Sequence, residues 1–534
     1  MKKREPMVIT NRQLIETTAA AGGAGLTWEM RRAYPFSSPK ADEYPQFRHQ
    51  LAGLGTFGSQ PAGIFCASRA CAREAEKKSM AVADQIVAVE RTRAPGLLLS
   101  IMLAVVLSVP ALAQTITIKA DPNNPGAMIP ANFIGFSGEV EDFVGGIYSA
   151  SNTSLVGILQ LLGPNGVMRI GGGTEADVPP DPLTPQIANN AAGFLSALGP
   201  GWTLLYGLPD GVNDPGLAVQ HAGFLLNAFG KGQVAFQFGN EPNLHYQDNE
   251  QAWLDVVSSY YSALTATYGA LNYGAPDTSQ LLDLNWPNDT PIGGGGFQFL
   301  TTHKYWPYAC NPLPSFPSAK SILDDAQVPS LPGWSLTEFG IICDGGDPRI
   351  TNRLIAATYY LRLAQSAAAG GWVGIMPHNV VIPELWGDGK TRPAYYNQFI
   401  VQPDGGYAPT PMFYGMYLFA QIVGQQIIPV STGADYGRVA SITATLSPNS
   451  NANILVANIN PRRGFYVKPD QTRPWSSANV FVLSGINCAD PAPVLNGYPI
   501  GEGGSWGGSV ATLNQGQSVF VPSCGATLIE IQAD

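Results

Sequence analysis

Two glutamates stand out because each one closes a run of apolar residues. Glu241 lies in Phe-Gly-Asn-Glu-Pro and Glu338 in Trp-Ser-Leu-Thr-Glu-Phe-Gly, and Lys and Arg are scarce around both. Two carboxylates in opposite protonation states can cleave a glycosidic bond, because one protonates the leaving oxygen while the other attacks or stabilises the anomeric carbon. A lone Glu at a strand end more often forms a solvated ion pair, but two at matched positions favour acid–base chemistry.

The elements that must hold these glutamates alternate between strand-like and helix-like patterns. We predict strands at 132–137, 167–171, 202–207, 234–239, 271–275, 299–305, 334–339 and 373–378, with helical spacing at 155–162, 218–228, 250–268 and 353–369. Eight such strands predict a (β/α)₈ barrel over 131–405. A doubly wound sheet is the alternative, but Arg169-Ile-Gly-Gly-Gly-Thr174 has neither the P-loop Lys nor the dinucleotide spacing.

The pattern changes after the predicted barrel. Short strands with turn signals at 438–446, 452–459, 479–483, 518–521 and 526–531 predict a C-terminal antiparallel β-sandwich domain over 406–534. A strand at 115–119, within the segment 114–130, precedes the barrel, and we expect it to pair with the sandwich because isolated strands are unstable.

In a barrel the carboxyl ends of the strands form the open mouth, so polar residues at those ends are site candidates. They are Glu139, Asn240, Glu241, His303, Tyr305, Glu338, His378 and Asn379. Five of these could instead converge on a divalent ion: Glu139, Glu241, His303, Glu338 and His378. No His-x-His or His-Glu-x-x-His spacing supports that alternative, so we expect neither a metal nor an organic cofactor.

Asn240-Glu241-Pro242 closing the fourth strand, with Glu338 closing the seventh, resembles the retaining (β/α)₈ glycoside hydrolases. The resemblance implies that Glu241 is the acid/base, that Glu338 is the nucleophile, and that Asn240 binds the sugar 2-hydroxyl.

A narrower resemblance is to glycoside hydrolase family 79, the β-glucuronidases and heparanases, and it extends over residues 114–534. Residues 129–139, 168–177, 303–305 and 408–415 carry it. It implies that Tyr305 bonds the nucleophile and that Glu139 and Asp177 border the sugar subsite. We expect His303, beside Tyr305, at the site as well.

The chain departs from that family after the second glutamate. Cys343 stands where many members have a Tyr, but Gly345 and Gly346 follow, and their backbone amides could hold a uronate carboxylate. The resemblance implies a retaining, exo-acting β-glucuronidase. The alternatives are a retaining glycosidase of neutral sugars, an endo-acting polysaccharide hydrolase and a non-catalytic carbohydrate-binding protein.

Residues 1–113 end in a pattern typical of export. Basic residues, an apolar run and Ala111-Leu-Ala113 predict a secretory signal at about 91–113, with Gln114 as the mature N-terminus and translation starting near Met80. A membrane anchor is the alternative, but Pro110 and the small residues favour cleavage. We therefore expect a secreted or periplasmic protein with no stable membrane span.

Charge and cysteine content limit the partners further. Residues 1–113 hold 14 Lys and Arg and nine Asp and Glu, which leaves 15 basic and 30 acidic residues, a net charge of −15, in the remainder. Such a charge disfavours nucleic acid as a partner and leaves carbohydrate. Disulfides 310–343 and 488–524 are plausible, although free thiols remain an alternative.

Overall fold

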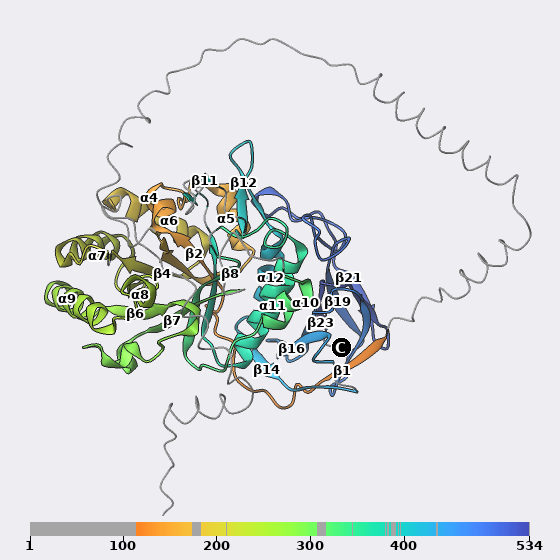
Figure 1. The fold of residues 1–534 in the computed structure, drawn as a ribbon. Coiled ribbons are helices and arrows are strands. Elements are labelled where there is room, and N and C mark those ends of the chain that lie inside the picture. Colours follow the sequence, from red (N-terminus) through yellow and green to blue (C-terminus); the bar gives the residue numbers. More distant parts are fainter. Residues whose placement is uncertain are drawn as a thin grey trace, which may run out of the picture. The chain divides into compact units, whose positions relative to one another are not determined.

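The computed structural model describes residues 114–173, 183–209, 211–306, 317–343, 345–379, 397–433 and 436–532, together with 381, 384–385, 391–392 and 395. They belong to one compact unit. This unit contains a barrel and a β-sandwich (Figure 1).

Eight parallel strands close the barrel in chain order, as the sequence predicts. They are β2 (Gly135–Glu139), β3 (Asn165–Gly171), β4 (Gly201–Leu208), β5 (Val234–Phe238), β6 (Asn272–Thr278), β7 (Phe299–Trp306), β8 (Trp334–Ile341) and β9 (Gly374–Asn379). The (β/α)₈ barrel fold is therefore confirmed.

Helices surround the barrel: α4 (Val140–Val144), α5 (Thr153–Gln160), α6 (Pro185–Leu198), α7 (Pro215–Phe229), α8 (Pro242–His245), α9 (Glu250–Tyr268), α10 (Ala319–Asp325), α11 (Leu354–Ala369) and α12 (Pro411–Ala420). The bounds of α9 match the prediction. The sequence pattern did not predict α4, α6, α8, α10 or α12. Helix α12 is apolar and buried nearly all round, which erases its amphipathic period.

The barrel interior changes from apolar to polar along the strands. Val167, Leu205, Ala235, Phe299 and Met376 form a small cluster of their own. Because side chains alternate along a strand, the inward position two residues after Val167 is Arg169, and the one after Ala235 is Gln237. The polar layer lies nearer the mouth and is buried.

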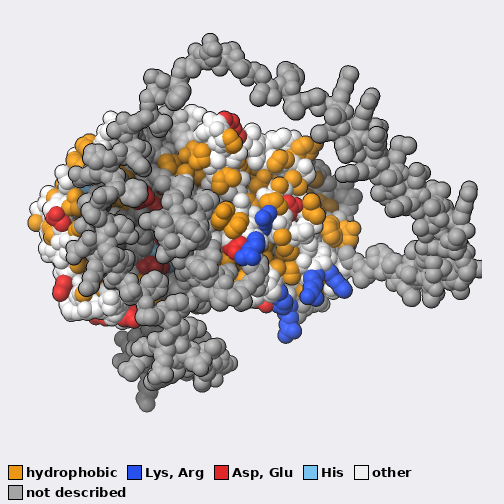
Figure 2. All heavy atoms as spheres, turned by 45° about the horizontal axis from the view of Figure 1, so that its top comes forward, with side chains coloured by type: hydrophobic (Ala, Val, Ile, Leu, Met, Phe, Trp, Pro, Cys, Tyr) orange, Lys and Arg blue, Asp and Glu red, His pale blue; other side chains and the backbone are white. Residues whose placement is uncertain are grey.

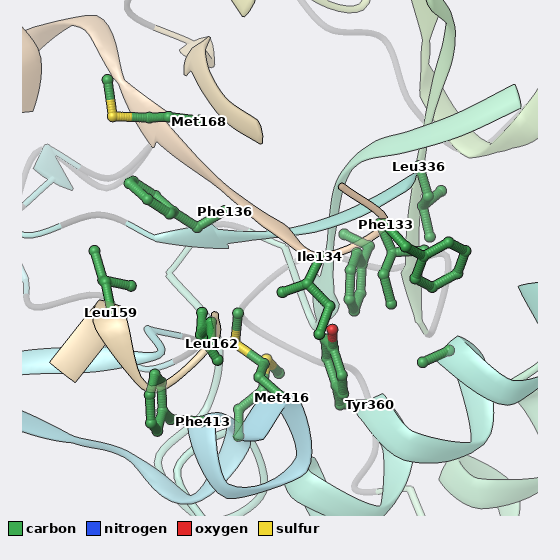
Figure 3. Close-up of a cluster of buried hydrophobic side chains, with 14 of the residues drawn as sticks. Phe133, Ile134, Phe136, Leu159, Leu162, Met168, Leu336, Tyr360, Phe413 and Met416 are labelled. Atoms are coloured by element: carbon green, nitrogen blue, oxygen red, sulfur yellow. The ribbon is translucent and has the colours of Figure 1, made fainter. Parts of the chain in front are cut away.

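The outer barrel surface packs against the helices. Phe133 and Ile134, just before β2, and Phe136 within it lie among side chains of α5, α11 and α12 (Figure 3). These contacts belong to a core cluster that continues into the sandwich through Leu455, Leu483 and Leu528.

The sandwich has two sheets. One has the order β15-β1-β18-β22, and the other has the order β14-β16-β17-β23-β19-β20 with β21 also on β19. The bounds are β1 (Thr115–Ala120), β14 (Gln426–Ile428), β15 (Val430–Thr432), β16 (Ala440–Leu446), β17 (Ala452–Asn458), β18 (Phe465–Gln471), β19 (Ser477–Ser484), β20 (Val494–Leu495), β21 (Ala511–Asn514), β22 (Val519–Val521) and β23 (Ala526–Ile531). Two short ladders lie outside these sheets and the barrel. One pairs β10 (Glu384–Leu385) with β11 (Thr391–Arg392), and the other pairs β12 (Phe399–Val401) with β13 (Tyr407–Pro409).

Strand β1 pairs antiparallel with β15 and parallel with β18, so the sandwich contains one parallel pair. The sequence did not predict β18, since Pro469 interrupts its strand-like run.

Cys488 and Cys524 form a disulfide, as proposed from the sequence. The other pairing, 310–343, involves Cys310, which lies outside the described residues. In the described part of the chain, no helix has both the length and the apolar character that crossing a membrane requires.

Candidate active site

Glu241 and Glu338 both lie at the barrel mouth. Glu338 is in β8, where its Cα pairs with that of His303 in β7. Glu241 follows β5 after Gly239 and Asn240, and it adopts a left-handed backbone conformation with φ 47° and ψ 51°. Pro242, whose ring favours the first turn of a helix, then starts α8. This sharp reversal turns the chain at the strand end, where Glu241 N–H donates to the carbonyl of Asp277 at 3.1 Å.

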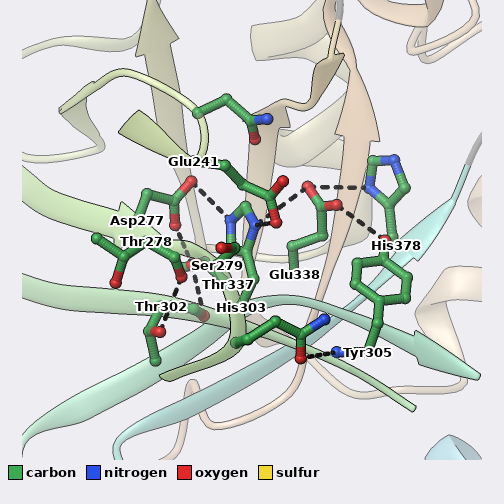
Figure 4. Close-up of polar contacts among 12 residues, drawn as sticks. Glu241, Asp277, Thr278, Ser279, Thr302, His303, Tyr305, Thr337, Glu338 and His378 are labelled. Carbon is green, nitrogen blue, oxygen red and sulfur yellow. Dashed lines mark hydrogen bonds and ion pairs between the residues drawn. The ribbon is translucent and has the colours of Figure 1, made fainter. Parts of the chain in front are cut away.

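Hydrogen-bond donors and positive charge surround Glu338, and Figure 4 shows Tyr305, His303 and His378 among them. Arg169 Nη1 donates to Oε2 at 2.7 Å, and the Tyr305 hydroxyl donates to Oε1 at 2.8 Å. Burial alone would raise the pKa of Glu338, but His378, His303 and Arg169, together with the Tyr305 hydrogen bond, lower it to about 2. Glu338 is therefore ionised at neutral pH, as a nucleophile must be.

Glu241 has a different environment. Its side chain is 24% exposed, and its Oε1 lies 3.1 Å from His303 Nδ1. The same nitrogen lies 4.0 Å from Glu338 Oε2. The two carboxylate oxygens are therefore at most about 7 Å apart, an upper limit that includes the ~5 to 5.5 Å found between the carboxyl groups of retaining glycosidases.

Arg169 joins the two glutamates into one network. Its Nη2 donates to Asn240 Oδ1 at 2.7 Å and to Asp277 Oδ2 at 2.6 Å, while Nη1 reaches Glu338. Gln237 and Ser137 also accept hydrogen bonds from Arg169, at 3.1 and 3.0 Å. Asn240 is thus held beside the pair.

Asp277 and His303 complete the network. His303 Nε2 lies 2.9 Å from Asp277 Oδ2, and both side chains are fully buried. Burial would lower the pKa of His303, but Asp277 and Glu338, with Glu241, raise it to about 10. Burial opposes ionisation of Asp277 too, yet His303 and Arg169 hold its pKa below the ordinary value.

Glu139 reaches the site through a histidine. Glu139 Oε1 lies 2.9 Å from His378 Nε2, and His378 Nδ1 lies 3.7 Å from Glu338 Oε2. Ser137 Oγ is 3.2 Å from the same Nδ1. The histidine thus connects the first strand of the barrel with the buried glutamate.

Of the remaining candidates, the structure describes the two glycines and does not describe Asp177. Gly345 and Gly346 lie in the turn after β8 with φ of 79° and 74°, and the Gly345 carbonyl accepts from Tyr395 N–H at 2.5 Å. Asp177 lies outside the described residues. Among the residues that the structure describes, no group of three or more His, Cys, Asp or Glu is arranged to hold a metal.

Sequence reasoning did not select Arg169 or Asp277 as site residues. An Arg on the inward face of an otherwise apolar strand, two residues after Val167, was a usable signal. Asp277 was hidden because Ala275-Pro-Asp-Thr278 has the composition of a turn.

Comparison with known proteins establishes the class of fold. No protein-family model and no curated protein sequence matches the chain. A solved 4-O-α-L-rhamnosyl-β-D-glucuronidase from Fusarium oxysporum 12S, in complex with Rha-GlcA, is similar with a TM-score of 0.60 and 16% identity, over 78% of this chain and 100% of that one. An α-L-arabinofuranosidase from Thermotoga maritima has a TM-score of 0.58 at 11% identity, with the same coverage of both chains. A monomeric β-xylosidase from Caulobacter crescentus CB15 has a TM-score of 0.52 at 12% identity, over 79% and 99%.

At these identities the likeness shows the fold alone. The chain therefore has a barrel with an additional β domain, which solved glycoside hydrolases of several specificities share.

Proposed function

We propose that the protein is a secreted retaining β-glycosidase, most specifically an exo-acting β-glucuronidase. The observation that carries the proposal is the pair Glu241 and Glu338, which share His303 Nδ1 while one is partly exposed and the other is buried among cations. Different environments for two nearby carboxyl groups support separate acid and nucleophile roles.

The reaction takes two displacements. Glu338 attacks the anomeric carbon and the glycosidic bond breaks, while Glu241 gives its proton to the leaving oxygen. A glycosyl ester on Glu338 and a free aglycone result. In the second step the Glu241 carboxylate takes a proton from water, the water oxygen attacks the same carbon, and the ester bond breaks to restore the Glu338 carboxylate.

The glucuronide specificity rests on weaker support than the reaction class. The solved neighbour with a Rha-GlcA ligand is a glucuronidase, and Gly345 and Gly346 follow β8 in left-handed conformations that can direct backbone amides at an anion. We propose these amides as the uronate-binding group, with Glu139 and Asp177 at the border of the sugar subsite.

A retaining glycosidase of neutral sugars is the second candidate. Arg169, His303 and His378 each already face a carboxylate, so no additional charge from them is available to a uronate. Two solved neighbours act on arabinose- or xylose-containing substrates according to their names.

A panel of aryl glycosides tests both candidates. We expect the chain from Gln114 onward to hydrolyse aryl β-glucuronide faster than aryl β-glucoside, β-galactoside, β-xyloside and α-arabinofuranoside, and the anomeric configuration of the released sugar to be retained by NMR. Preference for a neutral sugar would support the second candidate, and hydrolysis of none would refute the proposed enzyme.

Glu338→Gln tests the nucleophile. The variant loses the attacking carboxylate, so turnover should fall to the background rate. Glu502→Gln is the matched control, because Glu502 lies in the sandwich segment and not at the barrel mouth. Turnover by Glu338→Gln at more than a few per cent of the control rate contradicts the assignment.

A further inference from the structure

Asp277 lies beside Glu241, near the end of β6, and has no role in the two displacements (Figure 4). Its side chain is completely buried. Oδ2 accepts from Arg169 Nη2 at 2.6 Å and lies 2.9 Å from His303 Nε2, and Oδ1 accepts from the Thr337 hydroxyl. Its carbonyl accepts the N–H of Glu241.

We propose that Asp277 is a positioning residue that keeps His303 doubly protonated and so decides which oxygen of Glu241 carries the transferable proton. The inference rests on the proposed function, but its central claim concerns the charge of His303 and can be tested without a substrate.

A second buried histidine of the same chain shows what burial does without an anion. His221 is buried, its Nδ1 lies 3.1 Å from the Tyr206 hydroxyl, and burial lowers its pKa to about 4. His303 is buried at least as deeply, yet its pKa is raised. The difference between the two sites is the set of carboxylates around His303, of which Asp277 is the nearest.

Every charged group that faces His303 in the described structure can be named. Asp277 lies on β6, Glu241 follows β5, and Glu338 lies on β8. Arg169 contacts Asp277 and Glu338 from β3, and His378 on β9 faces Glu338 from the other side. Asp277 is the one carboxylate of the three that does not take part in the displacements, so it can hold its charge throughout the cycle.

The protonation of His303 fixes the geometry of proton transfer. A doubly protonated ring places its positive charge and Nε2–H 2.9 Å from Asp277 Oδ2 as an ion pair, and it donates Nδ1–H to Glu241 Oε1. Because Oε1 then accepts a hydrogen bond, the acid proton of Glu241 sits on Oε2, the other oxygen. A neutral ring would keep its one N–H toward Asp277, and its bare Nδ1 would accept the proton of Oε1 instead.

Histidine NMR on the full mature chain, labelled with ¹⁵N-histidine, tests the charge directly. We expect one imidazole, absent from the spectrum of His303→Gln, to remain doubly protonated from pH 6 to 9 in the unaltered protein. In Asp277→Asn this imidazole should lose its second proton roughly two or more pH units lower. Asp325→Asn is the matched control, since Asp325 pairs with Lys304, the neighbour of His303 on β7, at 3.0 Å.

Each outcome decides the inference. A His303 signal that titrates at or below its ordinary value in the unaltered protein overturns it, even if Asp277→Asn fails to fold. An unchanged titration in a folded Asp277→Asn, or an equal shift in Asp325→Asn, overturns it as well.

Enzyme activity is a second measurement, and its pH dependence would not change if the role of Asp277 were only structural. With an aryl glycoside substrate, kcat/KM of Asp277→Asn should fall. The basic limb of its pH–rate profile should move to higher pH, because the carboxylate of Glu241 loses His303 as a charged hydrogen-bond donor. If no glycoside is hydrolysed, the proposed function fails while the NMR result still stands.

Discussion

At the scale of single residues, the site is a chain of alternating charges. Glu338, Arg169, Asp277, His303 and Glu241 follow one another through contacts of 2.6 to 3.1 Å. Burying one such charge alone is strongly unfavourable, so each side chain depends on its oppositely charged neighbours. Substitutions that remove only a hydrogen bond and leave the charges in place are therefore the most informative.

Tyr305→Phe is such a substitution. It removes the 2.8 Å hydrogen bond to Glu338 Oε1 and no charge. A hydrogen bond to a charged group contributes about 1.5 to 3 kcal/mol, so kcat/KM should change by roughly 10- to 100-fold. Because this bond helps to lower the pKa of Glu338, its loss should raise that pKa, and the acidic limb of the pH–rate profile should move to higher pH.

Tyr360→Phe is the control for this experiment. The Tyr360 hydroxyl is buried with no hydrogen-bond partner among the described residues, and its ring packs against Phe339. Its removal should leave the pH–rate profile unchanged. Equal profiles for the two variants would show that the Tyr305 hydroxyl does not act on Glu338.

At the scale of elements, helices α11 and α12 pack so closely that the size of one side chain limits their separation. Helix α12 lies against α11 in a core that reaches β2, as Figure 3 shows. A Cβ on Gly415 of α12 would lie 2.5 Å from the carbonyl oxygen of Ala357 in α11. The backbones therefore approach each other more closely than any side chain at this position allows.

Two glycine-to-alanine changes separate packing from helix propensity. Gly415→Ala should lower the free energy of unfolding by about 1 to 3 kcal/mol, because backbone atoms must move apart. Gly193→Ala in α6 should raise it by roughly 0.5 to 1 kcal/mol, because the new Cβ would meet only Ala150 Cβ, at 3.8 Å. Urea unfolding monitored by circular dichroism measures both, and changes of the same sign would contradict this packing.

At the scale of the whole described molecule, the barrel and the sandwich share hydrogen bonds and a core. Gln365 of α11 donates to the Leu455 carbonyl at 3.0 Å, and the Leu354 and Ile355 N–H groups donate to the carbonyls of Asp490 and Cys488. The start of α11 is thus bonded to the loop that the Cys488–Cys524 disulfide holds.

Figure 2 shows apolar side chains over much of the visible face, with the Lys and Arg side chains on the sandwich side.

Loss of this disulfide should destabilise both parts together. The two cysteines are 36 residues apart, and a closed loop of that size contributes about 2 to 4 kcal/mol. A Cys488→Ala, Cys524→Ala double variant should therefore unfold at lower temperature in calorimetry, still in one transition, with kcat/KM at low temperature unchanged. Two separate transitions would show that the barrel and the sandwich do not unfold as one unit.

Much of the fold could be predicted from local patterns. Residues 234–239 and 334–339 read as buried strands because an apolar run that ends at polar residues is a local property of the chain, and both are barrel strands. Helix α9 was predicted with its bounds for the same reason. Helix α12 was missed because a helix buried on nearly all sides has no polar face to reveal its period.

The sequence by itself determined the barrel and the positions of Glu241 and Glu338 at its strand ends, because both follow from short-range periodicity. Only the tertiary structure decided their partners: Arg169 meets Glu338 across 169 residues and Asp277 across 108. Closing the barrel brings strand ends from distant parts of the chain to one mouth. The charge of a buried group depends on these neighbours, which no local spacing encodes.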